Sequence, residues 1–222
     1  MIRYRLVNWI VRAAFRTVCR VDAAELKKIP SAGPMIVVGN HVNFMEAPVV
    51  LAFYDNPAFT GIAKRESWKN PLFFVLFNTW GIIPIDRGMV DREAFRLSLA
   101  ALAAGKILAL SPEGTRSKDG RLLPGKPGVV AIAQRSGAPL TPVGFYGHVN
   151  FWENMKHLRR TDFHVAVGKP FRISNSEEAL ARENRQAVTD EIMMKIAEQL
   201  PPEYRGTYAT DGPVQYRFLQ DA

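Results

Sequence analysis

The sequence predicts an α/β fold in which a mostly parallel central sheet is flanked by helices. Short apolar runs alternate with longer helix-like segments along the chain. Hydrophobic residues make up 47% of the chain and charged residues 23%, which is ordinary for a globular protein. The 222 residues suffice for one sizeable core. Strands that alternate with helices typically build a parallel sheet between helical layers.

The N-terminal segment, from Ile2 to about Val21, is predicted to be a helix because it contains neither proline nor glycine. A helical wheel gathers basic side chains in one sector and apolar side chains in the opposite one. The basic sector holds Arg5, Arg12, Arg16 and Arg20, and the apolar sector holds Val7, Val11, Ala14, Phe15 and Val18. The arginines are too frequent for a membrane-spanning helix or a secretory signal. Two interpretations stay open: an amphipathic helix on an anionic membrane surface, or an apolar face packed on the protein body.

The rest of the chain divides into further predicted strands and helices, without repeats or a long linker. The predicted strands are Met35–Val38, Phe59–Ala63, Ile82–Ile85, Ile107–Leu110, Leu140–Phe145 and Phe163–Val167. The predicted helices are Phe44–Tyr54, Pro71–Thr79, Arg92–Ala104, Gly128–Ser136 and Glu177–Gln199. Residues 1–28 are interpreted as a basic amphipathic arm and residues 29–222 as one domain.

The net charge of +8 is concentrated in the arm. Residues 1–28 carry seven basic and two acidic groups, whereas the other 194 residues carry 22 and 19. Proteins that bind nucleic acid usually spread basic residues over a broad docking face, so this distribution does not favour nucleic-acid binding. The single cysteine, Cys19, excludes an intrachain disulfide and a thiol zinc cluster, and a reducing cytoplasmic setting is the default.

The first candidate for catalysis is His41. It follows a predicted strand and precedes a predicted helix, and open α/β sheets hold their active sites at such strand ends. Glu46 lies five residues further on. A carboxylate that accepts from one imidazole nitrogen fixes the tautomer and leaves the other nitrogen free to take a proton. The pair predicts general-base catalysis, although the same spacing also arises by chance.

A second candidate is the turn-rich loop Ser111–Gly120, which follows another predicted strand. Gly114 allows close approach of the backbone, and Arg116 can hold a phosphate through two parallel hydrogen bonds. Lys64 and Arg87 follow two further strands. In a parallel sheet these residues end on one rim and form a phosphate pocket beside His41. The alternative is a surface turn in which Arg116 pairs with Glu113.

The order of these motifs resembles the glycerolipid acyltransferases. The matching segments are Asn40-His41 with its acid at Glu46, Ala63–Glu66, Gly81–Gly88, Ser111–Ser117, Pro139–Val143 and Val167–Pro170. They cover about residues 30–172. The chain departs from the family pattern at Glu46, where aspartate is usual, and at Asn43, where serine is usual.

The resemblance implies an O-acyltransferase that moves a fatty acyl group from acyl-CoA or acyl-carrier protein to the hydroxyl of a lysophospholipid such as 1-acylglycerol-3-phosphate. It implies that His41 is the base and Glu46 its orienting acid, without an acyl-enzyme, metal or cofactor. The implied phosphate-binding residues are Lys64, Arg87 and Arg116, with Glu113 and Gly114 shaping the pocket. The expected location is the cytoplasmic face of a membrane.

Other functions stay open at this point. One is an acyl-thioester hydrolase in which His41 activates water. Another is an acyltransferase that acts on a different lysolipid or on glycerol-3-phosphate, which uses the same chemistry on another acceptor. A third is a lipid-binding scaffold without catalysis.

Overall fold

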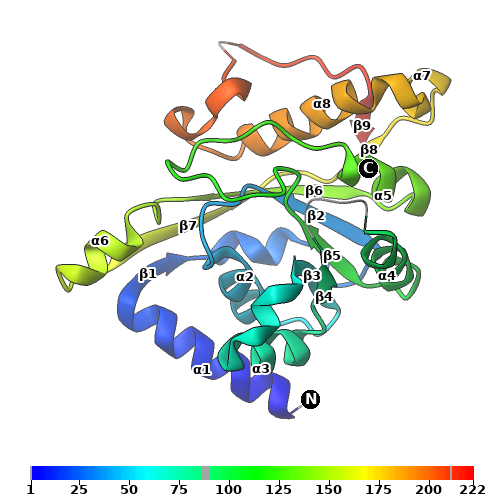
Figure 1. Cartoon of the computed structure of the whole chain (residues 1–222). Coiled ribbons are helices and arrows are strands. Elements are labelled where there is room, and N and C mark those ends of the chain that lie inside the picture. Colours follow the sequence, from blue (N-terminus) through cyan, green and yellow to red (C-terminus); the bar gives the residue numbers. More distant parts are fainter. Residues whose placement is uncertain (1, 87–90, 211) are drawn as a thin grey trace.

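The apolar runs pair into one sheet that crosses the molecule between two layers of helices (Figure 1). The structure is a computed structural model that describes residues 2–86, 91–210 and 212–222. Within these residues the strands are β1 (Cys19–Asp22), β2 (Met35–Gly39), β3 (Phe59–Lys64), β4 (Ile83–Ile85), β5 (Ile107–Leu110), β6 (Leu140–Tyr146), β7 (Thr161–Val167), β8 (Phe171–Ile173) and β9 (Leu219–Asp221). Their order is β1-β7-β6-β2-β5-β3-β4, and β8 joins β6 to β9.

The central strands are parallel, as the sequence predicts. Strand β2 pairs with β5 and β6 in parallel, and β3 pairs with β5 and β4 in parallel. Strand β7 runs antiparallel to β6, and β8 and β9 form a short antiparallel extension. The carboxyl ends of β2, β3, β4, β5 and β6 therefore lie at the same edge of the sheet. The loops that leave this edge contain His41, Glu113, Gly114 and Arg116, while Lys64 ends β3 and Glu46 begins α2.

The helices form two layers because alternate residues of the central strands point to opposite faces. They are α1 (Ile2–Val18), α2 (Glu46–Tyr54), α3 (Pro71–Trp80), α4 (Arg92–Ala103), α5 (Gly128–Ser136), α6 (Phe151–Lys156), α7 (Glu177–Leu180) and α8 (Arg185–Ala197). Ile36 and Val38 pack in the core beneath α4, α5 and α8. Met35 and Val37 pack in the core beneath α1, α2 and α3. Figure 1 shows these layers above and below the sheet.

Helix α1 ends at Val18, a few residues before the predicted end, because Cys19–Asp22 pairs with β7 as a parallel edge strand. Most of the apolar sector recognised in the sequence faces the protein body: Val11 is buried, and Val7, Phe15 and Val18 are half-buried, whereas Ala14 is exposed. A different apolar face is exposed. It consists of Ile2, Leu6, Trp9 and Ile10, of which Trp9 is 64% exposed. The predicted apolar face therefore packs mainly on the protein body, which was the second of the two interpretations. The exposed apolar face lies beside it.

One buried polar residue fixes α1 to its neighbours. The Nδ2 atom of Asn8 donates to Asp55 Oδ1 at 2.6 Å, just beyond α2. The indole Nε1 of Trp80, at the end of α3, donates to Asn8 Oδ1 at 2.8 Å. These hydrogen bonds join three helices at a single side chain. Over the part of the chain that the structure describes, no helix combines the length and apolarity needed to cross a membrane.

The C-terminal region differs from the single long helix predicted over Glu177–Gln199. Helix α7 ends at Leu180, and Ala181 has an extended conformation (φ −61°, ψ 139°). The chain then forms a 3₁₀ turn and α8. The tail continues through two more 3₁₀ turns, Pro202–Tyr204 and Gly206–Tyr208, and ends in β9. The tail thus completes the sheet.

Candidate active site

The imidazole of His41 and the carboxylate of Glu46 are in direct contact. His41 lies two residues beyond β2, and Glu46 is the first residue of α2. The distance from His41 Nδ1 to Glu46 Oε2 is 2.8 Å. The His41 side chain is 21% exposed, whereas that of Glu46 is 6% exposed. The histidine is thus accessible from solvent while its acid is enclosed.

The turn before α2 holds the Glu46 carboxylate in place. The backbone amides of Val42 and Asn43, which precede the helix, donate to Glu46 Oε1 at 3.2 and 2.8 Å. Such hydrogen bonds favour the ionised carboxylate. The side chain of Asn43 also accepts from the amide of Met45, so it stabilises the same turn. This turn brings the histidine and the acid together across only five residues.

Glu46 has a second imidazole partner, His148. The Nε2 atom of His148 lies 2.5 Å from Glu46 Oε1, and the His148 side chain is fully buried. Burial raises the pKa of Glu46, but the hydrogen bonds with His148 and His41 outweigh it and lower the pKa to about 2. The carboxylate is therefore ionised at neutral pH, and it accepts from both rings.

Glu113 connects the loop after β5 to His41. Its Oε1 atom accepts from the backbone amide of His41 at 2.9 Å, and its Oε2 atom accepts from the amide of Leu123 at 3.2 Å. Burial raises the pKa of Glu113 to about 7, against the two backbone hydrogen bonds that favour ionisation. The carboxylate faces backbone amides and not Arg116, so the surface turn closed by an Arg116–Glu113 pair does not form.

The remaining loop residues place a basic surface next to His41. Gly114 has a φ of +64°, and a Cβ there would lie 3.3 Å from Lys126 Nζ. The amide of Ser117 donates to the His41 carbonyl at 2.7 Å, which docks the loop on the end of β2. Arg116 is exposed and makes no ion pair with any described residue. The backbone of the loop therefore contacts His41, whereas its basic side chain Arg116 lies in solvent.

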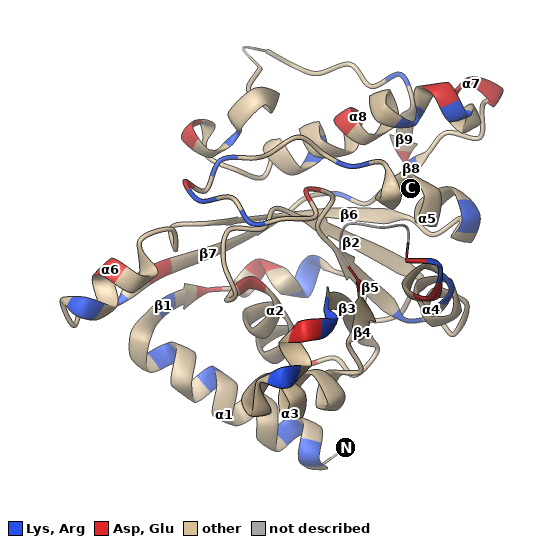
Figure 2. Ribbon diagram, in the orientation of Figure 1, with Lys and Arg blue, Asp and Glu red and all other residues tan. Residues whose placement is uncertain are grey.

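Of the other predicted phosphate-binding residues, Lys64 lies further along the same edge. Lys64 ends β3 and forms an ion pair with Glu66. Strand β3 is two positions from β2, which corresponds to roughly 10 Å. Arg87 lies outside the described residues. Figure 2 shows basic residues spaced along the loop between β5 and α5, beside the sheet edge.

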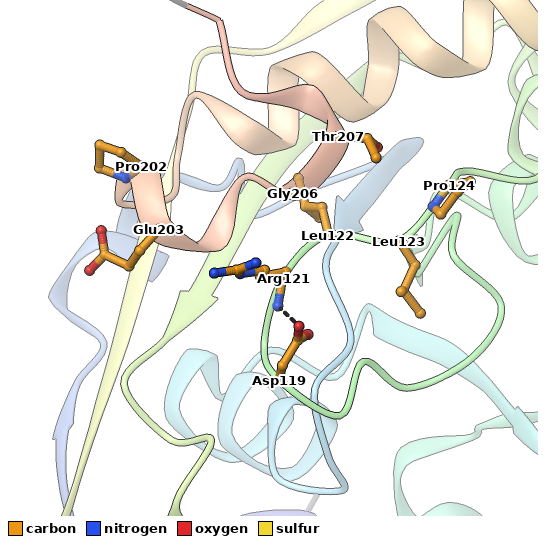
Figure 3. A pocket seen from close by; sticks show the side chains of 9 residues that line it. All are labelled: Asp119, Arg121, Leu122, Leu123, Pro124, Pro202, Glu203, Gly206 and Thr207. Atoms are coloured by element: carbon orange, nitrogen blue, oxygen red, sulfur yellow. Dashed lines mark hydrogen bonds between the residues drawn. The ribbon is translucent and has the colours of Figure 1, made fainter.

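An open hollow of about 450 Å³ adjoins this loop (Figure 3). Its walls are Asp119 and residues 121–124 on the loop side, and Pro202, Glu203, Gly206 and Thr207 on the tail side. The amide of Leu123, one of these wall residues, also donates to Glu113. The hollow is thus joined to the His41 site through a single buried carboxylate.

Comparison with known proteins identifies the family. The family model described as Acyltransferase matches residues 20–146, which is more than half of the 222 residues. The chain belongs to the Acyltransferase family. The matched region of this acyltransferase chain contains β1 to β6, and hence the edge that carries His41, Glu46 and Glu113.

The acyltransferase chain also resembles individual proteins. It is 28% identical over 187 residues to the chloroplastic 1-acyl-sn-glycerol-3-phosphate acyltransferase BAT2 of Brassica napus, covering 82% of this chain and 51% of that protein. It is 26% identical over 137 residues to the 1-acyl-sn-glycerol-3-phosphate acyltransferase of Bacillus subtilis, covering 62% and 66%. The chain spans about half the length of several curated relatives that it matches.

The fold is shared with a solved acyltransferase structure. The crystal structure of the 1-acyl-sn-glycerophosphate acyltransferase PlsC from Thermotoga maritima superimposes with a TM-score of 0.61 at 27% identity. The match covers 84% of this chain and 76% of that chain. The similarity confirms the α/β fold and the family resemblance that the motif order indicates.

Among the residues around His41, His148 was not recognised from the sequence, and Asn40 was recognised only as part of the motif, without a role. His148 has no partner at a motif spacing, because Glu46 lies 102 residues away. Asn40 clamps β2 to β6 by accepting from the Phe145 amide at 2.7 Å and donating to the Phe145 carbonyl at 2.8 Å. The available signal for His148 was its position: it follows the end of β6, at the same sheet edge as His41.

Proposed function

We propose that this acyltransferase moves a fatty acyl group from a thioester, acyl-CoA or acyl-carrier protein, to the hydroxyl of a lysophospholipid, with 1-acylglycerol-3-phosphate as the preferred acceptor. The observation that carries the proposal is the 2.8 Å contact between His41 Nδ1 and Glu46 at an edge bordered by exposed basic residues. Membership of the family and the names of the relatives support the same chemistry.

The geometry suits direct transfer. With its Nδ1 proton donated to Glu46, His41 presents an unprotonated Nε2 that makes no hydrogen bond to any described residue. His41 Nε2 takes the proton of the acceptor hydroxyl while the hydroxyl oxygen attacks the thioester carbonyl carbon. The carbon–sulfur bond then breaks, and the thiolate takes the proton back from the imidazolium. The products are an ester and a free thiol, and no acyl-enzyme forms.

The loop after β5 supplies candidates for the two charged sites of this reaction. The Arg116 guanidinium and Lys64, at the same edge, would bind the acceptor phosphate, together with Arg87, which lies outside the described residues. The backbone amides of Thr115 and Arg116 make no hydrogen bond to described residues, so they are available for the developing oxyanion. The amide of Gly114 already donates to Ser111 at 3.2 Å. Glu113 and Gly114 would shape the pocket.

A membrane surface fits the outer face of α1 and α3. Exposed apolar side chains occur on both helices: Ile2, Leu6, Trp9 and Ile10 on α1, and Leu72, Phe74 and Val75 on α3. Figure 2 shows basic residues along α1, and anionic lipid headgroups attract such residues. We propose that this surface rests on the cytoplasmic face of a membrane, where lysophospholipid acceptors reside.

The decisive experiment supplies labelled oleoyl-CoA with and without 1-acylglycerol-3-phosphate and follows free thiol and labelled lipid together. Acceptor-dependent thiol release with label in a diacyl lipid is the expected result. Equal thiol release without acceptor indicates a hydrolase, and it contradicts the proposal. Parallel reactions with glycerol-3-phosphate, a neutral lysolipid and oleoyl-acyl-carrier protein identify the preferred acceptor and donor. Lipid binding without thiol release from either donor indicates a scaffold.

A further inference from the structure

The second histidine on Glu46 has no part in the proton transfer described above. His148 lies two residues beyond β6, in a turn that the surrounding backbone holds firmly. Gly147 has a φ of +90°, and a Cβ there would lie 2.8 Å from the Asp162 carbonyl oxygen. The Asn43 side chain donates to the His148 carbonyl at 3.1 Å. The ring is therefore placed by β2, β6 and β7 together, and it is not free to turn toward solvent.

The surroundings of His148 favour one tautomer. Its Nδ1 atom is buried and has no hydrogen-bond partner among the described residues. The ring packs against Phe163, with a centroid distance of 4.3 Å. A proton on Nδ1 would be a buried donor without an acceptor, at a cost of about 1–3 kcal/mol. The proton therefore belongs on Nε2, which donates it to Glu46 Oε1.

The two oxygens of Glu46 consequently have different tasks. Oε1 accepts from His148 Nε2 and from the amides of Val42 and Asn43. Among the described residues, Oε2 accepts from His41 Nδ1 alone. A carboxylate whose one oxygen is held by three donors cannot rotate, so the other oxygen stays directed at the His41 ring.

We propose that His148 is a positioning residue of the acyltransferase reaction: it fixes the Glu46 carboxylate so that His41 keeps its proton on Nδ1 and Nε2 free for the acceptor hydroxyl. This inference rests on the proposed function. It also gives a reason for glutamate at position 46. Aspartate is shorter by about 1.5 Å and does not span both imidazoles from this helix start.

Kinetics of two variants test the proposal. His148→Phe keeps a ring of similar size and removes the donor, whereas His148→Gln keeps an N–H near the position of Nε2. We expect His148→Phe to lower kcat by roughly 10–100-fold with KM for both substrates within about threefold. His148→Gln should recover kcat to within about fivefold of the parent. His157→Phe, at an exposed position on another loop, is the matched control and should change neither constant.

A double-mutant cycle separates positioning from general support of the core. If His148 acts through Glu46, His148→Phe causes less than a twofold further loss of kcat in a Glu46→Ala background. Equal losses in both backgrounds, or a His148→Gln variant as impaired as His148→Phe, overturn the proposal. Melting temperatures of all variants show which losses come from unfolding.

A measurement that does not depend on catalytic activity tests this inference separately from the proposed function. Imidazole ¹⁵N spectra of the full chain at neutral pH should show His148 protonated at Nε2 and His41 protonated at Nδ1. The His148→Phe variant should then shift the His41 ring signals. A His148 proton on Nδ1, or His41 signals that the variant leaves in place, refutes the positioning role. Absence of acyl transfer with these spectra as expected refutes only the proposed reaction.

Discussion

The Glu113 carboxylate lies 2.9 Å from the backbone nitrogen of His41 and so joins the loop after β5 to the loop after β2. The side chain is 1% exposed, and burial raises its pKa from an ordinary 4.5 to about 7. A carboxyl group with a raised folded-state pKa binds more protons in the folded chain between these two values. Its contribution to stability is complete below about pH 4.5 and is lost as the pH rises through about 7.

We therefore expect the free energy of unfolding to fall between about pH 4.5 and pH 7, by at most about 3 kcal/mol from this group. Glu113→Gln, which does not titrate, should flatten much of that fall. Urea unfolding at several pH values measures the free energy of unfolding of the parent and of the Glu113→Gln variant. Curves for the parent and the variant that run parallel across this range would remove Glu113 as the cause.

Replacement of the proposed base should abolish turnover without unfolding the protein. We expect His41→Ala to lower kcat by about 10²–10⁴-fold, because general-base catalysis contributes on that scale. Glu46→Gln should lower kcat by at least tenfold, because an amide cannot accept from both imidazoles. Acceptor-dependent thiol release measures the rate, and melting temperature checks the fold. A His41→Ala chain whose kcat stays within about tenfold of the parent's would exclude His41 as the base.

The basic residues on the sheet edge should discriminate between acceptors. Arg116→Ala is expected to raise KM for 1-acylglycerol-3-phosphate by about tenfold, since a charge-assisted hydrogen bond contributes about 1.5–3 kcal/mol. Lys64→Ala should act in the same direction. A neutral lysolipid should show little change, and Lys118→Ala on the same loop is the control. Equal effects on charged and neutral acceptors would contradict a phosphate-binding role.

The outer face of α1 should govern association with lipid vesicles. A Leu6→Glu, Trp9→Glu double variant is expected to weaken binding to anionic phospholipid vesicles by at least about tenfold, because it removes two exposed apolar side chains and adds like charge. Leu180→Glu changes an exposed apolar residue in the other helical layer and should leave binding unaltered. Sedimentation with vesicles measures the bound fraction. Parent-like binding by the double variant would mean that another surface meets the lipid.

The hydrogen bonds of Asn8 with Asp55 and Trp80 should stabilise the fold. Asn8→Leu removes the acceptor of the buried Trp80 Nε1 and the donor to Asp55. We expect a loss of about 1–3 kcal/mol in the free energy of unfolding, because a buried indole N–H is left unsatisfied. Denaturant unfolding followed by tryptophan fluorescence reports the change. An unchanged midpoint would show that α1 is held by its apolar face alone.

Local patterns were sufficient to predict the central strands and most helices. Met35–Gly39 is apolar throughout and is buried on both faces, so its sequence carries a strong strand signal. The short strands β1, β8 and β9 are three or four residues long, and their pairing depends on partners far along the chain. Cys19–Asp22 therefore looked like a continuation of the preceding helix. The break at Ala181 likewise has no proline or glycine to mark it in the sequence.

The candidate site likewise contains one contact that local sequence spacing predicts and one that only the tertiary structure shows. The short spacing of His41 and Glu46 made their contact predictable, because both lie on one strand-to-helix turn. The contact between His148 and Glu46 depends on β6 lying next to β2, and only the sheet order shows that. The predicted roles of Lys64, Arg87, Glu113, Gly114 and Arg116 in phosphate binding stay predictions.

The hydrogen bonds of Asn8 have a mechanical consequence. They join α1 to the C-terminal ends of α2 and α3, and the first residue of α2 is Glu46, which contacts His41. A helix anchored in this way does not move relative to α2 and α3. If the outer face of α1 rested on a bilayer, the His41 imidazole would therefore stay at a constant distance from the bilayer surface. Acceptors would have to reach that distance before they react.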